Sequence, residues 1–65
     1  MILCDFIQGM IDSNDLDYTK HKVDDFTIWS FKKGNELKIG NGVILYNDKK
    51  IEYLSDVVEI IKLNK

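Results

Sequence analysis

From Phe26 to Leu54 the sequence alternates between apolar and polar residues, and runs of turn-forming residues interrupt this alternation three times. A period of two is typical of β-strands that bury one of their two faces. The middle interruption, Asn41-Gly42, favours a two-residue hairpin turn because both turn residues need positive φ angles. The pattern predicts four antiparallel strands, at Phe26–Lys32, Glu36–Gly40, Val43–Tyr46 and Ile51–Leu54.

The turns determine which residues face each other across the predicted sheet. We expect a three-residue loop at 33–35, a two-residue turn at 41–42 and a four-residue turn at 47–50. The resulting cross-strand pairs are Phe31–Leu37, Trp29–Ile39 and Lys32–Glu36, then Leu37–Tyr46 and Ile39–Ile44, then Tyr46–Ile51 and Ile44–Tyr53. All three registers place one set on the same face: Trp29, Phe31, Leu37, Ile39, Ile44, Tyr46, Ile51 and Tyr53. A one-residue slip at any turn would break that set.

The opposite face of the predicted sheet is mixed. It carries Ile28, Ser30, Lys32, Glu36, Lys38, Val43, Leu45, Glu52 and Leu54. Its apolar row consists of Ile28, Val43 and Leu54, with Leu45 nearby. If no helix reaches this face, the row is exposed, and exposed apolar patches often mark interfaces.

Two amphipathic helices flank the strands. The first has apolar residues at helical spacing, at Ile2, Leu3, Phe6, Ile7, Met10 and Ile11, and Ser13-Asn14-Asp15 ends it. A polar connection follows, up to Asp25. The closing helix begins at Ser55 or Asp56 and covers the aromatic face with Val57, Val58 and Ile61. The expected fold is a single α+β domain over residues 1–65, with an N-terminal helix, a four-stranded antiparallel meander and a C-terminal helix packed on one sheet face.

Length and cysteine content limit the setting. A chain of 65 residues buries only about 60% of its unfolded surface, so a monomeric core is marginal and a homodimer stays open. Cys4 is the only cysteine and cannot form an internal disulfide, which favours a reducing compartment, the cytoplasm. The sequence also shows no signal peptide and no apolar run of the length that a membrane-spanning helix needs.

No motif in the sequence carries catalysis. His21 is the only histidine, and Cys4 and Ser30 have no base or thiolate-stabilising residue at a recognisable spacing. The aspartates at 12–17 do not fit the calcium-binding loop, which needs Gly at its sixth position and Glu at its twelfth. The glycines form no phosphate-binding pattern. We therefore expect no catalytic residues, no metal site, no cofactor and no enzymatic activity.

The charges are uneven along the chain. The net charge is −2, divided into −4 for residues 1–31 and +2 for residues 32–65. The acidic residues predicted to bind a partner are Asp12, Asp15, Asp17, Asp24 and Asp25, which could dock on a basic groove of another protein. The alternative interpretation is that these carboxylates are simply solvated.

The residue usage suggests a source. Ala and Pro, whose codons are rich in G and C, are absent, whereas Lys, Ile and Asn are abundant, which indicates an AT-rich genome. These traits are similar to those of small accessory proteins from phages of low-GC bacteria, which often inhibit a host enzyme or defence complex. The leading hypothesis is therefore a protein-binding phage inhibitor, acting in the host cytoplasm through its acidic surface or the mixed face.

The second hypothesis is a module that binds single-stranded nucleic acid. Small sheets can stack bases on aromatic side chains while lysines follow the phosphates. Trp29, Phe31, Tyr46 and Tyr53 are aromatic residues of the right type, and they are accompanied by lysines. Against this hypothesis, the predicted register places those rings under a helix, the net charge is negative, and Arg is absent. Nucleic acid is therefore the less favoured partner.

Overall fold

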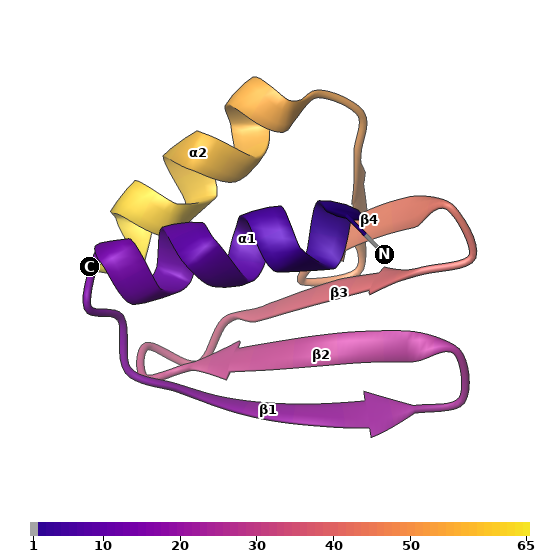
Figure 1. Cartoon of the computed structure of the whole chain (residues 1–65), viewed down its shortest axis with the longest axis horizontal. Coiled ribbons are helices and arrows are strands. Elements are labelled where there is room, and N and C mark those ends of the chain that lie inside the picture. The colour runs from indigo at the N-terminus through magenta and orange to yellow at the C-terminus, as the bar shows by residue number, and fades with distance from the viewer. Residues whose placement is uncertain (1) are drawn as a thin grey trace.

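The computed structural model describes residues 2–65, and for Ile2 only the backbone. The elements follow the order α1 (Ile2–Ser13), β1 (Tyr18–Val23), β2 (Phe26–Phe31), β3 (Glu36–Gly40), β4 (Val43–Tyr46), β5 (Lys49–Ile51) and α2 (Leu54–Leu63) (Figure 1). The strands form one antiparallel sheet in the order β1-β2-β3-β4-β5. The predicted α+β class, with a helix at each end of a meander, is confirmed.

The sheet has five strands because part of the predicted polar connection is a strand. β1 pairs with β2 from Tyr18 opposite Phe31 to Val23 opposite Phe26. All six of its residues are exposed, and its centre is Thr-Lys-His-Lys, so it has no alternation of apolar and polar residues. The Asp24-Asp25 turn that follows has Asp24 at φ 55°, a left-handed conformation that Asp tolerates better than most residues.

The register between β2 and β3 differs from the predicted one by two residues. Trp29 lies opposite Leu37 and Ser30 opposite Glu36, so the predicted pairs Phe31–Leu37, Trp29–Ile39 and Lys32–Glu36 are wrong. The loop consists of residues 32–34, where Gly34 has φ 90°, and the amide of Phe31 donates to the carbonyl of Asn35 at 2.8 Å. A left-handed glycine commonly ends a three-residue hairpin loop. A shift of two residues leaves every side chain on its predicted face.

The turn between β4 and β5 is shorter than predicted. Asn47 and Asp48 have φ angles of 50° and 68°, so they form a two-residue turn of the same kind as Asn41-Gly42. Ile44 therefore lies opposite Ile51, and the predicted pairs Tyr46–Ile51 and Ile44–Tyr53 are wrong. Tyr53 lies outside the sheet, 67% exposed, at the N-terminal end of α2. The register between β3 and β4 is the predicted one.

Both helices cover the same face of the sheet, which we call the covered face (Figure 1). The core joins residues from both helices to that face: Ile7, Ile11, Leu16, Trp29, Phe31, Leu37, Ile39, Val57 and Ile61. Of the predicted stripe on α1, Phe6 is half exposed and the side chain of Ile2 lies outside the described structure. The predicted packing of α2 on the aromatic face is confirmed.

The opposite face, which we call the open face, is covered by neither helix of the described chain. Strand alternation places on it Thr19, His21, Val23, Phe26, Ile28, Ser30, Glu36, Lys38, Val43, Leu45 and Lys50. Three residues predicted for this face lie outside the strands: Lys32 in a loop, Glu52 after β5, and Leu54 at the start of α2. The mixed face of the prediction is thus real, although its membership differs.

Candidate interaction surface

The centre of the open face is an apolar row of Phe26, Ile28, Val43 and Leu45. Ile28 is only 6% exposed, although neither helix of the described chain covers it. Phe26 lies opposite Gly40, where an added Cβ would come within 2.8 Å of the Phe26 ring, so the missing side chain of Gly40 makes room for that ring. Side chains within the sheet thus shield part of the row, and Val43 and Leu45 remain partly accessible.

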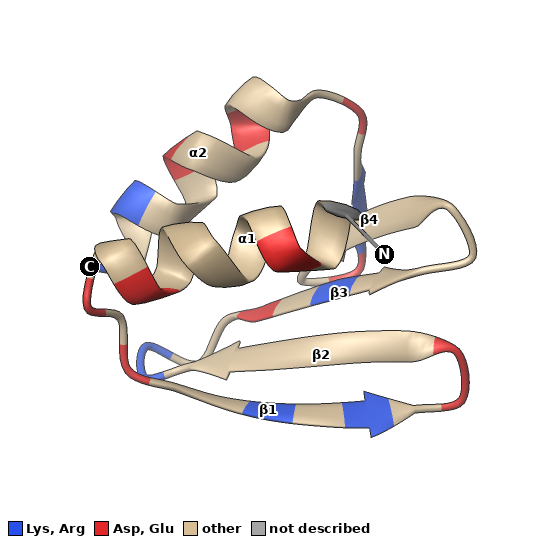
Figure 2. Ribbon diagram, in the orientation of Figure 1, with Lys and Arg blue, Asp and Glu red and all other residues tan. Residues whose placement is uncertain are grey.

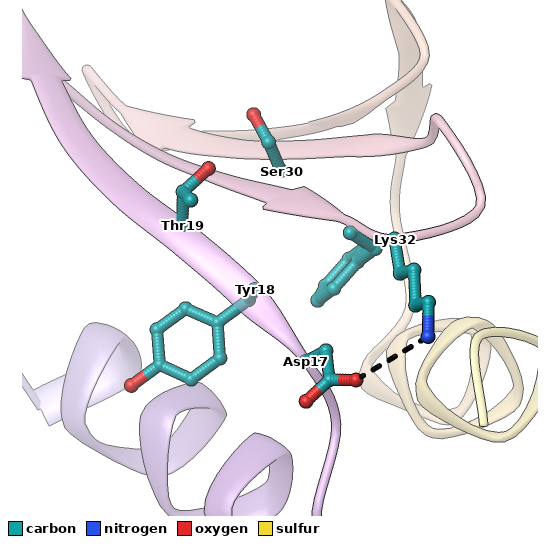
Figure 3. Close-up of a pocket in the computed structure, with 6 residues that line it drawn as sticks. Asp17, Tyr18, Thr19, Ser30 and Lys32 are labelled. Carbon is teal, nitrogen blue, oxygen red and sulfur yellow. Dashed lines mark ion pairs between the residues drawn. The ribbon is translucent and has the colours of Figure 1, made fainter.

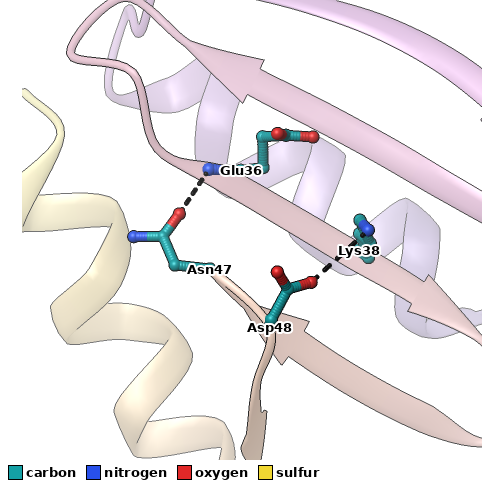
Figure 4. A network of polar contacts seen from close by, with 4 residues as sticks. All are labelled: Glu36, Lys38, Asn47 and Asp48. Atoms are coloured by element: carbon teal, nitrogen blue, oxygen red, sulfur yellow. Dashed lines mark hydrogen bonds and ion pairs between the residues drawn. The ribbon is translucent and has the colours of Figure 1, made fainter.

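Polar contacts anchor the start of β3 and Lys38, which lies between Ile28 and Leu45 on the open face (Figure 4). The Lys38 ammonium lies 3.6 Å from a carboxylate oxygen of Asp48, and the amide of Glu36 donates to Asn47 Oδ1 at 2.9 Å. The Lys38 side chain is only 32% exposed, so this ion pair is less screened by water than a fully exposed one. These contacts connect β3 to the turn between β4 and β5.

The five aspartates predicted to bind a partner do not form one surface. Asp12, Asp15 and Asp17 lie at the end of α1 and in the segment before β1, whereas Asp24 and Asp25 form the turn after β1 (Figure 2). A strand of six residues spans about 20 Å, so these two groups lie at opposite ends of the sheet edge. Whether either group binds a partner stays a prediction.

Asp12 takes part in an internal network. Its carboxylate accepts a hydrogen bond from Gln8 Nε2 at 3.0 Å, and Gln8 also donates to the hydroxyl oxygen of Tyr18 at 2.8 Å. Gln8 Oε1 in turn accepts from Trp29 Nε1 at 2.9 Å. This network fastens α1 to β1 and β2, so Asp12 has a structural role that its position in an acidic run did not reveal.

Asp17 borders an open hollow at the start of β1 (Figure 3). The hollow measures about 270 Å³ and is lined by Asp17, Tyr18, Thr19, Ser30, Phe31 and Lys32. The Asp17 carboxylate lies 4.0 Å from the Lys32 ammonium, and both side chains are about 80% exposed, so the pair is weak. The lining has three hydroxyls, those of Tyr18, Thr19 and Ser30, and two opposite charges, but no imidazole or thiol.

The residues considered for chemistry lie apart. His21 is exposed on the open face opposite Ile28, whereas Cys4 is a half-buried free thiol on α1. Among residues 2–65, no three side chains of His, Cys, Asp or Glu lie close enough to hold a metal ion. Of the aromatic residues considered for base stacking, Trp29 and Phe31 are buried under the helices and Tyr46 packs against the core. Tyr53 alone of these four is well exposed.

Comparisons of the chain with models of known protein families, with curated proteins and with solved structures found no match. In the described part of the chain, no helix has both the length and the apolar character that crossing a membrane requires.

Proposed function

We propose that this protein is a non-enzymatic protein-binding module, and that a protein partner docks on the open face. The observation that carries this proposal is the apolar row on a sheet face that neither described helix covers. Burying apolar surface in an interface is favourable by roughly 25 cal/mol per Å². Exposed apolar patches often mark interaction sites, and Phe26, Val43 and Leu45 of this row are partly accessible.

The partner is a different protein rather than a second copy. A compact monomer of 7.6 kDa has an accessible surface of about 4,300 Å² by the usual scaling with mass. The surface of this chain is 4386 Å², so the monomer is about as compact as folded monomers of its mass. The fold therefore does not need another copy to complete its core.

The specific role that we propose is inhibition of a host enzyme or defence complex by a phage-encoded protein. The residue usage of an AT-rich genome supports this source, and the free thiol of Cys4 suits a reducing cytoplasm. Binding alone is enough for such a role, because an inhibitor needs only to occupy a functional surface of its target. Single-stranded nucleic-acid binding has less support, since Trp29 and Phe31 lie under the helices.

The test is an affinity capture that compares variants of the two candidate surfaces. The first variant combines Val43→Lys with Leu45→Lys on the open face. The second combines Asp15→Asn, Asp17→Asn, Asp24→Asn and Asp25→Asn. Asn is used because Asp15 and Asp24 both have φ 55°, and Asn tolerates this left-handed conformation while Lys would strain it. The control is Leu63→Lys, at an exposed apolar residue of α2.

We expect a specific partner to be captured by the wild type, by the Leu63→Lys control and by the Asn variant, and to be lost with the open-face variant. If the Asn variant loses capture of the partner and the open-face variant keeps it, the interface lies at the acidic residues. Equal capture by all four proteins would contradict both surfaces. Circular dichroism of each variant confirms that it is folded before its capture is compared.

A further inference from the structure

The β1 edge of the sheet is long and unpaired, whereas the β5 edge is short. In residues 2–65, β1 has β2 on one side and no strand on the other, and all six of its residues are exposed. β5 has only three residues and continues into α2 within a few residues. A free edge of this kind offers backbone donors and acceptors to an added strand.

The backbone hydrogen bonds of β2 show which backbone groups of β1 are free. The amide of Phe31 donates to the Asn35 carbonyl, so Phe31 directs its backbone groups toward the β3 side. Because these directions alternate along an antiparallel strand, Ser30 and Ile28 direct theirs toward β1. Their partners Thr19 and His21 are therefore satisfied by β2. The outward-pointing amides and carbonyls of β1 are those of Tyr18, Lys20 and Lys22.

Two of these outward residues, Lys20 and Lys22, are positively charged, and they line a hollow together with Asp5 and Asp25. Tyr18, Lys20 and Lys22 lie opposite Phe31, Trp29 and Thr27, so all three project on the helix side of the sheet. In the described chain neither lysine forms an ion pair. The Lys20 ammonium lies 5.5 Å from the centre of the Trp29 ring, a weak cation–π contact that a carboxylate could replace.

Self-pairing of this edge is disfavoured by the same lysines. An antiparallel pair of β1 strands must place outward residues opposite outward residues. In the registers that pair five residues of the strand, Lys20 lies opposite either Lys20 or Lys22 of the second copy. Like charges directly opposite each other destabilise a strand pair. The edge therefore discriminates against a second copy and favours a strand with acidic residues.

We propose that β1 accepts an antiparallel strand from a partner protein, with Asp or Glu at two alternate positions of that strand facing Lys20 and Lys22. Asp17 and Asp24 flank the edge, so acidic residues beyond those two positions would be repelled. The complementary charges thus set the register as well as the partner. This inference rests on the proposed function in taking the partner to be a protein, but it concerns the edge rather than the open face.

Three capped peptides test this proposal. The acidic peptide is Thr-Val-Glu-Val-Glu-Val-Thr, and the other two carry Gln or Lys in place of both Glu residues. Amide hydrogen exchange of the whole protein is followed by NMR with and without each peptide. In the free protein the outward amides of Tyr18, Lys20 and Lys22 should exchange faster than the inward amides of Thr19 and His21. The acidic peptide should slow the outward amides, whereas the Lys peptide should not.

Two modified acidic peptides separate strand addition from simple charge attraction. In the antiparallel arrangement the backbone groups of each Glu point at β1 and those of each Val point away. N-methylation of the two Glu amides should therefore abolish protection, and N-methylation of the central Val amide should preserve it. Equal binding of both methylated peptides would overturn strand addition.

Charge-reversed proteins provide the matched controls. Lys20→Glu combined with Lys22→Glu should weaken the acidic peptide by about tenfold or more. Lys49→Glu combined with Lys50→Glu, at the other edge, should leave its affinity unchanged. If the Gln peptide protects the outward amides as well as the acidic peptide does, the requirement for acidic residues in the partner is wrong, but strand addition at the β1 edge still holds. If no peptide protects β1, the edge proposal is wrong. The proposed function is tested separately, by whether the open-face variant loses capture of the partner.

Discussion

On β4, Ile44 and Leu45 are neighbours in sequence but lie on opposite faces of the sheet. Ile44 packs against the core beneath the helices, whereas Leu45 belongs to the open face and lies opposite Lys38 on one side and Lys50 on the other. The two residues are of similar size and polarity, and both are half-buried. Hydrophobicity by itself therefore does not distinguish a core residue from a residue of the open face; the position of the helices does.

The largest effect is expected for removal of a covered-face aromatic ring. Trp29 is fully buried and donates to Gln8, so Trp29→Ala should cost about 3–5 kcal/mol of unfolding free energy. Phe26→Ala on the open face should cost only about 1–2 kcal/mol. Urea denaturation followed by circular dichroism measures both. Equal losses of unfolding free energy in the two variants would contradict the distinction between the covered face and the open face.

Two glycines, Gly40 in β3 and Gly9 in α1, differ in the space that an added methyl group would find. A Cβ at Gly40 would lie 2.5 Å from the carbonyl oxygen of Asp25, and a backbone atom cannot move away easily. Gly40→Ala should therefore destabilise the protein by about 1–3 kcal/mol. Gly9 in α1 has nothing within 4 Å of that position, so Gly9→Ala should stabilise by about 0.5–1 kcal/mol. Shifts of the melting temperature in opposite directions are the expected result.

The buried amide of Asn64 provides an intermediate effect. Its side chain donates to Ile60 O at 2.8 Å and Tyr46 Oη at 3.2 Å, and accepts from Asn35 Nδ2 at 2.8 Å. Asn64→Ala should cost about 1–2 kcal/mol, because partly buried partners lose their hydrogen bonds. Lys33→Ala removes an exposed bond to Leu63 O in the same region and should cost less. Equal losses in chemical denaturation would contradict this role of burial.

The smallest effect is expected for the exposed ion pair. Asp17→Asn removes the contact with Lys32, and we expect the unfolding free energy to change by no more than about 0.5 kcal/mol. Lys38→Gln removes the more shielded pair with Asp48 and should cost more than Asp17→Asn. Repeating both measurements in high salt should reduce the difference, since salt screens surface charges.

The sequence was sufficient to predict the faces of β2, β3 and β4 and the register between β3 and β4, but not the registers of β2 with β3 or of β4 with β5. Alternation assigns each residue to a face, and the errors at both outer turns were shifts of two residues, which preserve faces. Choosing between turn lengths at Gly34 and Asn47 required the left-handed conformations that the structure shows. Positive φ is open to several Asn, Asp and Gly residues in this chain, so residue type did not decide the choice.

The sequence does not predict β1, because this strand is stabilised by pairing with β2 and not by burial of an apolar face. Its centre is Lys-His-Lys, and although Tyr18, Thr19 and Val23 have side chains that favour strands, they do not alternate with polar residues on one apolar face. The signal that could have found it is the Asp24-Asp25 pair between two short segments, a weaker turn signal than Asn-Gly. β1 also separates the five aspartates that the sequence predicts to form one acidic surface.

The open face was predicted as one of two alternatives, because the sequence does not determine where α1 packs. Placement of a helix depends on tertiary contacts such as those of Ile7 and Ile11 with the core, which no local pattern encodes. The free edge and its two lysines could not be predicted at all without β1.

The most direct test of this account is equilibrium urea unfolding of Ile44→Lys and Leu45→Lys, the same substitution at neighbouring residues on opposite faces. The account predicts that Ile44→Lys loses about 3 kcal/mol or more, because an unpaired ammonium would be forced into the core. It predicts that Leu45→Lys loses about 1 kcal/mol or less, because the open face remains in contact with water. Similar losses in the two variants would contradict the division of the sheet into a covered and an open face.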